Sequence, residues 1–71
     1  MLTLKELGVI CASHRKEYGA RQVDVASDTG YTIQNVSLFE RGGNDNSLIF
    51  TWYLLHGLDI NKLRKDFNND H

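Results

Sequence analysis

Residues 22 to 42 read QVDVASDTGYTIQNVSLFERG and contain two short helical patterns separated by a glycine. The first pattern ends at Gly30, because a glycine readily adopts the left-handed conformation that stops a helix. Thr32 can cap the second pattern by accepting a hydrogen bond from the amide of Gln34 or Asn35. A further glycine closes the stretch. We therefore predict two helices, the first over about residues 21 to 29, joined by a short turn.

Helical spacing continues on the N-terminal side of this stretch. Thr3 and Glu6 have the spacing of a capping box, in which each side chain satisfies a free amide of the other residue. The first helix should reach about Tyr18 and end at Gly19. Its inner face should carry Leu4, Leu7, Ile10 and Cys11, with His14 at the edge.

The most apolar segment is LIFTWYLLHG, residues 48 to 57. It is far too short to cross a membrane, so it is expected to form a core helix capped by Asn46 or Ser47. The spacing places Leu48, Trp52 and Leu55 on its buried stripe, with Ile49 and Phe50 flanking them.

A last helix is expected from Asn61 to about Phe67, and residues 68 to 71 should form a frayed tail. The chain has no proline and no alternating strand pattern bounded by hairpin signals. We therefore predict an all-α fold, a compact domain of five helices over residues 1 to 67.

Composition narrows the possible roles of the 71 residues. Eight lysines and arginines against nine acidic residues give a net charge of −1, so the net charge does not indicate a polyanion-binding protein. No apolar run approaches the roughly 20 residues that span a bilayer. The single cysteine, Cys11, cannot form an intramolecular disulfide. We expect a soluble cytoplasmic protein that contacts no membrane.

Residues 22 to 42 resemble the lambda-repressor-like or Cro-type helix-turn-helix family. They match its pattern without a gap, and the resemblance extends outward to residues 15–22 and 47–60. The physical roles agree, because two helices cross at the small Ala26 and Gly30 permits the turn. The matching positions are Gln22, Val25, Ala26, Gly30, Thr32, Val36, Ser37, Phe39, Glu40, Arg41 and Gly42.

The resemblance implies that the third helix, about residues 33 to 41, lies in the major groove of operator DNA. Gln34 would then read adenine, and Gln22 would donate to a phosphate at the start of the second helix. Arg15 and Glu40 resemble a pair that ties the first helix to the third in this family. The positions nearest the DNA, or nearest a protein bound in its place, would be Arg21, Gln22, Thr32, Ile33, Gln34, Asn35, Ser37, Leu38 and Arg41.

Helical geometry gives the same outward face for the third helix. At about 100° per residue, Val36 and Phe39 fall on one side and belong to the core. The other side carries Gln34, Ser37, Leu38 and Arg41, with Ile33 and Asn35 at its edges.

Two features depart from a DNA-binding pattern. Arg21 stands where the family commonly has a threonine cap, and the loop GGNDN after the third helix contains Asp45 and no lysine. Phosphates would be held by Arg41 and the amides from Gly42 to Asn44. Other candidate cations are few: Arg21, Lys16, Lys62, Arg64 and Lys65. The apolar Ile33 and Leu38 would suit a protein partner instead.

The leading hypothesis is a sequence-specific transcriptional regulator of phage or mobile-element type. It would read operator DNA with the third helix, as a dimer on two half-sites. The last helix would form the dimer contact in the family's manner, or simply close the core. The alternative is a modulator or antirepressor that uses the same fold to bind a partner repressor and to block or alter its DNA binding.

Other features of the sequence are interpreted structurally. The three histidines lack metal-ligand spacing, Cys11 is expected to be a small buried hydrophobe, and Asp24 and Asp28 are expected to lie on a solvated face. We therefore expect no catalytic activity, metal, cofactor or small-molecule ligand.

Overall fold

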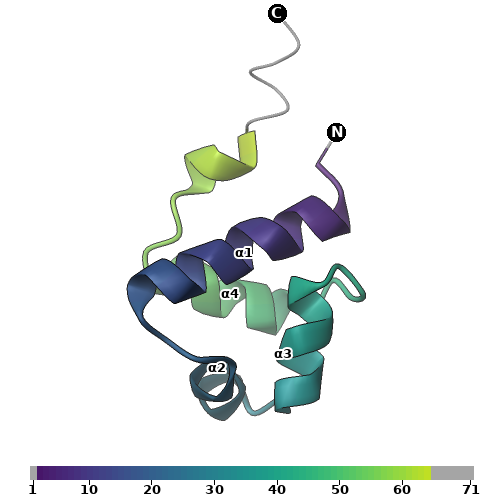
Figure 1. Cartoon of the computed structure of the whole chain (residues 1–71), viewed down its shortest axis with the longest axis vertical. Helices are drawn as coiled ribbons and strands as arrows, with labels where there is room; N and C mark the ends of the chain where they lie inside the picture. Colours follow the sequence, from purple (N-terminus) through teal and green to yellow (C-terminus); the bar gives the residue numbers. More distant parts are fainter. Residues whose placement is uncertain (1, 65–71) are drawn as a thin grey trace, which may run out of the picture.

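The computed structural model describes residues 2–64 and consists of helices connected by short loops (Figure 1). The α-helices are α1 (Leu4–Tyr18), α2 (Gln22–Thr29), α3 (Ile33–Glu40) and α4 (Ser47–Leu55), and a 3-10 helix, η1 (Ile60–Arg64), follows them. The described residues contain no strand, which confirms the all-α prediction. None of their helices is long and apolar enough to cross a membrane.

The predicted fifth α-helix is wrong in type and in its starting point. Asp59, not Asn61, begins the turn, because its carboxylate accepts from the amide of Asn61 at 2.9 Å and its carbonyl accepts from Lys62 at 3.0 Å. A short 3-10 helix results, and it packs against α1. The predicted continuation to Phe67 and the predicted tail over residues 68 to 71 lie outside the described residues.

Local capping sets the ends of α1 as the sequence predicts. The Thr3 hydroxyl accepts from the Glu6 amide at 3.1 Å, and the Glu6 carboxylate accepts from the Thr3 amide at 3.0 Å. Gly19 ends the helix with a φ of 91°, a conformation that side-chain-bearing residues rarely adopt. These bonds join residues three or four positions apart, so the local sequence is enough to predict them.

Helix α4 is rotated relative to its predicted orientation. Asn46 caps it as expected, but the buried side chains are Ile49, Trp52 and Tyr53. Leu48 is 59% exposed and Leu55 is 78% exposed, so the predicted stripe was wrong for both leucines.

The position of Tyr53 explains this rotation. Its hydroxyl donates to Glu40 on α3, so the Tyr53 face of α4 must point inward. Leu48 and Leu55 lie about 140° and about 200° around the helix from Tyr53, which turns both toward solvent.

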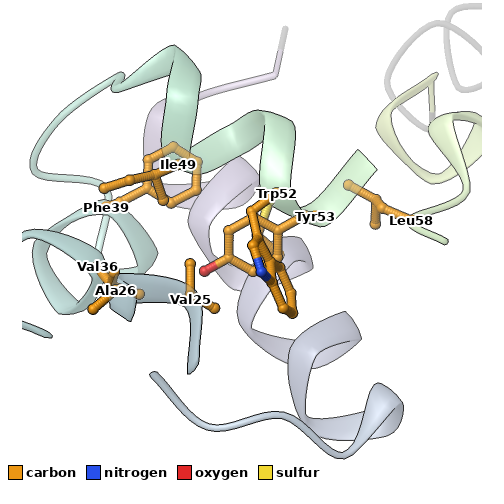
Figure 2. Close-up of a cluster of buried hydrophobic side chains, with 9 residues drawn as sticks. Val25, Ala26, Val36, Phe39, Ile49, Trp52, Tyr53 and Leu58 are labelled. Carbon is orange, nitrogen blue, oxygen red and sulfur yellow. The ribbon is translucent and has the colours of Figure 1, made fainter. Parts of the chain in front are cut away.

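The core forms where α2, α3 and α4 meet α1. Figure 2 shows the buried side chains converging from these elements. The rings of Phe39 and Tyr53 stack with centroids 5.8 Å apart, which joins α3 to α4. Cys11 is fully buried, as expected, and burial raises its pKa to about 12, which disfavours the thiolate. The core members are Cys11, Val25, Ala26, Val36, Phe39, Ile49, Trp52, Tyr53 and Leu58.

A glycine lets α1 approach the end of α3. A Cβ atom on Gly8 would lie 2.7 Å from the carbonyl carbon of Glu40 and 2.8 Å from the carbonyl oxygen of Phe39. Because both are backbone atoms, they cannot move aside without shifting α3. The absence of a side chain at Gly8 therefore brings Arg15, two turns further along α1, within reach of Glu40.

The buried carboxylate of Glu40 joins all four α-helices. Arg15 of α1 donates to it through Nε at 2.8 Å and through Nη2 at 3.0 Å, so the ion pair expected from the sequence is present. Gln22 of α2 donates through Nε2 at 3.0 Å, and Tyr53 of α4 donates through its hydroxyl at 2.5 Å. Arg15 also donates to the carbonyl of Ala20 between α1 and α2. We call Glu40, Arg15, Gln22 and Tyr53 the Glu40 cluster.

The Glu40 cluster keeps its carboxylate ionised despite burial. Burial opposes the charge and would raise the pKa of Glu40, but hydrogen bonds from Arg15, Tyr53 and Gln22 outweigh it and lower that pKa. Burial and the bond to Glu40 raise the pKa of Tyr53, while the same carboxylate raises the pKa of Arg15.

The first prediction concerns acid stability. Because folding lowers the pKa of Glu40, its charge stabilises the fold fully above the ordinary value of 4.5 and this contribution is lost as the pH falls through the lowered value. Glu40→Gln should reduce the free energy of unfolding at pH 7 by about 3 kcal/mol, since Arg15 loses its buried partner. The difference from the unmodified chain should shrink as the pH falls below the ordinary value of 4.5 and through the lowered pKa of Glu40.

Thermal denaturation followed by circular dichroism across this pH range measures both effects. Asp45→Asn removes an exposed carboxylate and is the matched control. Tyr53→Phe, which removes one hydrogen bond, should cost less, about 1 to 2 kcal/mol. A Glu40→Gln variant with unchanged stability at pH 7 would contradict the role given to the cluster.

The second prediction tests the rotation of α4. Ile49→Ala should reduce the free energy of unfolding by about 2 to 5 kcal/mol, because Ile49 is fully buried. Leu55→Ala should change it by less than about 0.5 kcal/mol, because that side chain is largely exposed. Urea denaturation compares the two, and the opposite order would mean that the stripe predicted from sequence spacing is buried after all.

Candidate functional site

The outward side of α3 is the candidate binding surface. Val36, Phe39 and Glu40 point inward and are buried, which leaves the opposite side of the helix to solvent. Ile33 is 45% exposed and Leu38 is 39% exposed. We call this side the α3 surface, and its members are Ile33, Gln34, Ser37, Leu38 and Arg41.

Two of the predicted contact residues cap the start of α3, as the sequence predicts for Thr32. The Thr32 hydroxyl accepts from the Asn35 amide at 3.1 Å and donates to the Asn35 side-chain oxygen at 2.8 Å. The Thr32 amide donates to the same oxygen at 3.4 Å. Thr32 and Asn35 therefore cap the helix and fix where the α3 surface begins.

Gln22, predicted to contact a phosphate, is held by the Glu40 cluster. Its amide nitrogen donates to the Glu40 carboxylate, and the residue is only partly exposed. Gln22 thus connects the N-terminus of α2 to the inner side of α3. The sequence pattern gives the position of Gln22, but only the fold shows that a buried carboxylate lies beside it.

A carboxylate occupies the N-terminus of α2. The Asp24 side chain accepts from the Arg21 amide at 2.8 Å and lies 3.6 Å from the Arg21 guanidinium. The bond from the Arg21 amide lowers the pKa of Asp24, and the nearby guanidinium adds to this effect. A phosphate that approached the amides at the N-terminus of α2 would meet the negative charge of Asp24.

The prediction of a solvated face for Asp24 and Asp28 was incomplete. Both residues are at least partly exposed, but Asp24 caps α2 and Asp28 accepts from the Trp52 indole at 2.8 Å. The second bond ties the end of α2 to α4. The sequence contains no local signal for it, because the two residues are 24 positions apart.

The loop after α3 folds back onto the helix. The amides of Gly42 and Gly43 donate to the carbonyls of Phe39 and Leu38 at 3.0 and 2.8 Å. The Asn44 side chain bonds to the Asn35 carbonyl and to the Asn46 amide. The amides of Gly42 and Gly43, expected to hold phosphates, are thus already satisfied within the chain.

Side chains near the α3 surface show no excess of positive charge. Arg41 lies against its own helix, where its Nε donates to the Ser37 carbonyl at 3.3 Å. Glu40, the buried charge of α3, is neutralised by Arg15. The ionisable residues of segment 21–46 other than Glu40 and Tyr31 are Arg21 and Arg41 against Asp24, Asp28 and Asp45.

The remaining candidate cations lie on other elements. Lys16 is in the last turn of α1. Lys62 is on η1, the 3-10 helix packed against α1, and its Nζ lies 3.9 Å from the carboxylate of Glu17 on α1. Arg64 ends the same 3-10 helix, and Lys65 lies outside the described residues. Among the described residues, Lys16, Lys62 and Arg64 therefore belong to α1 and η1 and not to α2 or α3.

The sequence does not indicate the contact between Leu38 on the α3 surface and Gly43. Leu38 lies over Gly43, where a Cβ atom would approach its side chain to 2.7 Å at Cγ. Gly43 thus leaves room for Leu38 in its observed position. Tyr31, two positions before Ile33, is also 36% exposed and adds an aromatic side chain near the start of α3.

Comparison of the chain with models of known protein families, with curated proteins and with solved structures finds no match. The function must therefore be argued from the chemistry of the α3 surface itself.

The third prediction concerns Gly43 and Leu38. Gly43→Ala should displace the Leu38 side chain, whose exposed tip can rotate, and should change stability by less than about 1 kcal/mol. The Leu38 methyl resonances in a ¹³C spectrum should shift. In a Leu38→Ala background the effect of Gly43→Ala on neighbouring resonances should largely disappear, as a double-mutant cycle tests. Unchanged Leu38 methyl resonances would show that the two residues do not constrain each other.

Proposed function

We propose that this chain is a small regulator of the lambda-repressor-like helix-turn-helix type that binds a partner repressor through the α3 surface. The observation that carries the proposal is the exposure of Ile33 and Leu38 on the outward side of α3. Apolar side chains at the centre of a contact patch are typical of protein interfaces.

The charge of the region supports the same choice. Protein–DNA interfaces are strongly positive, and a full operator complex neutralises on the order of 6 to 10 phosphates. Segment 21–46 offers two basic residues against three acidic ones besides the buried Glu40, and Asp24 occupies the N-terminus of α2. A protein surface tolerates this distribution, whereas a phosphate backbone would be repelled by it.

Operator DNA is the second candidate, and two observations favour it. The order α2, short turn, α3 is the arrangement that helix-turn-helix proteins place in a major groove. Gln34 is exposed on the same side of α3 as Arg41, and a glutamine can bond adenine through two atoms. Under this candidate the α3 surface has the same members and a different ligand.

The fourth prediction separates the two ligands. If the partner is a protein, the chain should co-purify with a helix-turn-helix repressor that is produced together with it. Leu38→Asp should weaken this complex by more than about tenfold, because a charge would be buried at the contact. Val9→Asp, the same change at an exposed apolar position on α1, is the matched control and should leave affinity unchanged.

The DNA arm uses the promoter of the gene that encodes this chain. A mobility shift given by this chain alone, lost steeply between 50 and about 200 mM salt and altered by Gln34→Ala, would overturn the protein-binding proposal in favour of operator DNA. Binding of the repressor with equal affinity by Leu38→Asp and by the unmodified chain would show that the α3 surface is not the contact. Circular dichroism of each variant establishes that it is folded.

A further inference from the structure

A second surface, separate from α3, lies between the end of α2 and the outer side of α4. It is an open groove of about 440 Å³, and no residue of α3 lines it. We call it the α2/α4 groove, and its lining residues are Asp28, Thr29, Leu48, Thr51, Trp52, Leu55 and His56. The proposal above does not use this groove.

The hydrogen-bond donors of the groove are already in use. The Thr29 hydroxyl donates to the Val25 carbonyl at 2.7 Å, and the Thr51 hydroxyl donates to the Ser47 carbonyl at 2.7 Å. The Trp52 indole donates to Oδ2 of Asp28. A ligand would therefore find few free donors among these side chains.

His56 presents an acceptor. Its Nδ1 lies 2.7 Å from the Trp52 carbonyl, which can only accept, so Nδ1 carries the hydrogen. In the neutral ring Nε2 is then an acceptor, and no donor among the described residues bonds to it. The ring is held in place, since it stacks on Trp52 with centroids 3.9 Å apart and meets the edge of Tyr18 at 5.4 Å.

Asp28 supplies the charge. Oδ2 is bonded to the Trp52 indole, and within the described residues no side chain or amide bonds to Oδ1. Within residues 2–64 the groove is lined by no lysine or arginine. The α2/α4 groove thus combines one carboxylate and one imidazole acceptor without a compensating cation.

Leu48 and Leu55 form the apolar sides of the groove. They are 59% and 78% exposed, the two most exposed leucines among the large apolar residues. An arginine stem can pack along such side chains while its charged end bonds elsewhere.

We propose that the α2/α4 groove binds an arginine side chain of a partner protein. The guanidinium bonds to Asp28 and to Nε2 of His56, and the aliphatic stem lies between Leu48 and Leu55. Arginine fits better than lysine, because its planar fork has five donors and can serve two separate acceptors at once. The charge complementarity of the groove selects this occupant.

The experiment uses the full chain labelled with ¹⁵N and three probe peptides. Acetyl-leucyl-arginyl-leucine amide is the test peptide, its citrulline analogue is the neutral isostere, and its lysine analogue replaces the fork by a single ammonium. Trp52 is the only tryptophan, so its indole resonance reports on the groove without ambiguity. We expect a saturable shift of this resonance with the arginine peptide, and at least tenfold weaker binding of the other two.

Asp28→Asn is the main variant, because an asparagine oxygen can still accept from the Trp52 indole while the charge is lost. It should weaken binding of the arginine peptide at least tenfold. Asp45→Asn removes the same charge from the loop after α3 and should have no effect. Leu55→Ser alters an exposed residue that the fold does not need, and it should weaken binding several-fold.

Equal shifts with the citrulline peptide would overturn the proposal, because contact would then be apolar only. Equal binding of the lysine peptide would overturn the choice of arginine. An arginine-peptide affinity unchanged in Asp28→Asn, or no saturable shift of the Trp52 resonance, would also refute it. None of these results depends on the α3 surface, so they leave the proposed function to its own test.

Discussion

Glu40 accepts hydrogen bonds from side chains on the three other α-helices, and this buried charge constrains the whole arrangement. An ionised carboxylate away from water is tolerated only when donors surround it. Arg15, Gln22 and Tyr53 can reach it together only if α1, α2 and α4 each present one particular side to α3. The close approach of α1 at Gly8 is part of the same requirement. In a domain of this size, the Glu40 cluster fixes the orientation of the helices together with the small core.

The Glu40 cluster also determines what α3 displays. Because Glu40, Phe39 and Val36 are fixed inward, Ile33, Gln34 and Leu38 must point outward, and the caps at Thr32 and Asn35 hold the helix start. The backbone of α3 is therefore held in place by the contacts of its inward side. The exposed side chains of the α3 surface can vary while the inward contacts of α3 are kept, so one helix arrangement can serve different ligands.

The two surfaces differ in chemistry and in origin. The α3 surface is apolar at Ile33 and Leu38, whereas the α2/α4 groove combines the Asp28 carboxylate with exposed leucines. The groove exists because the Glu40 cluster turns Tyr53 inward, which leaves Leu48 and Leu55 outside. One buried interaction therefore accounts for both the support of α3 and the exposure of the apolar side of α4.

The sequence by itself determined the ends of α1, the starts of α3 and α4 and the inward side of α3, because capping residues, glycine stops and helical spacing act over three or four residues. It also indicated the Arg15–Glu40 pair, through the matching pattern around it. Only the tertiary structure decided that Gln22 and Tyr53 complete the cluster, that Asp28 bonds Trp52, and that Leu48 and Leu55 face solvent. These features depend on how helices far apart in the chain pack together. The spacing of apolar residues within one helix can fit more than one buried side, and the neighbouring helices decide which of them is buried.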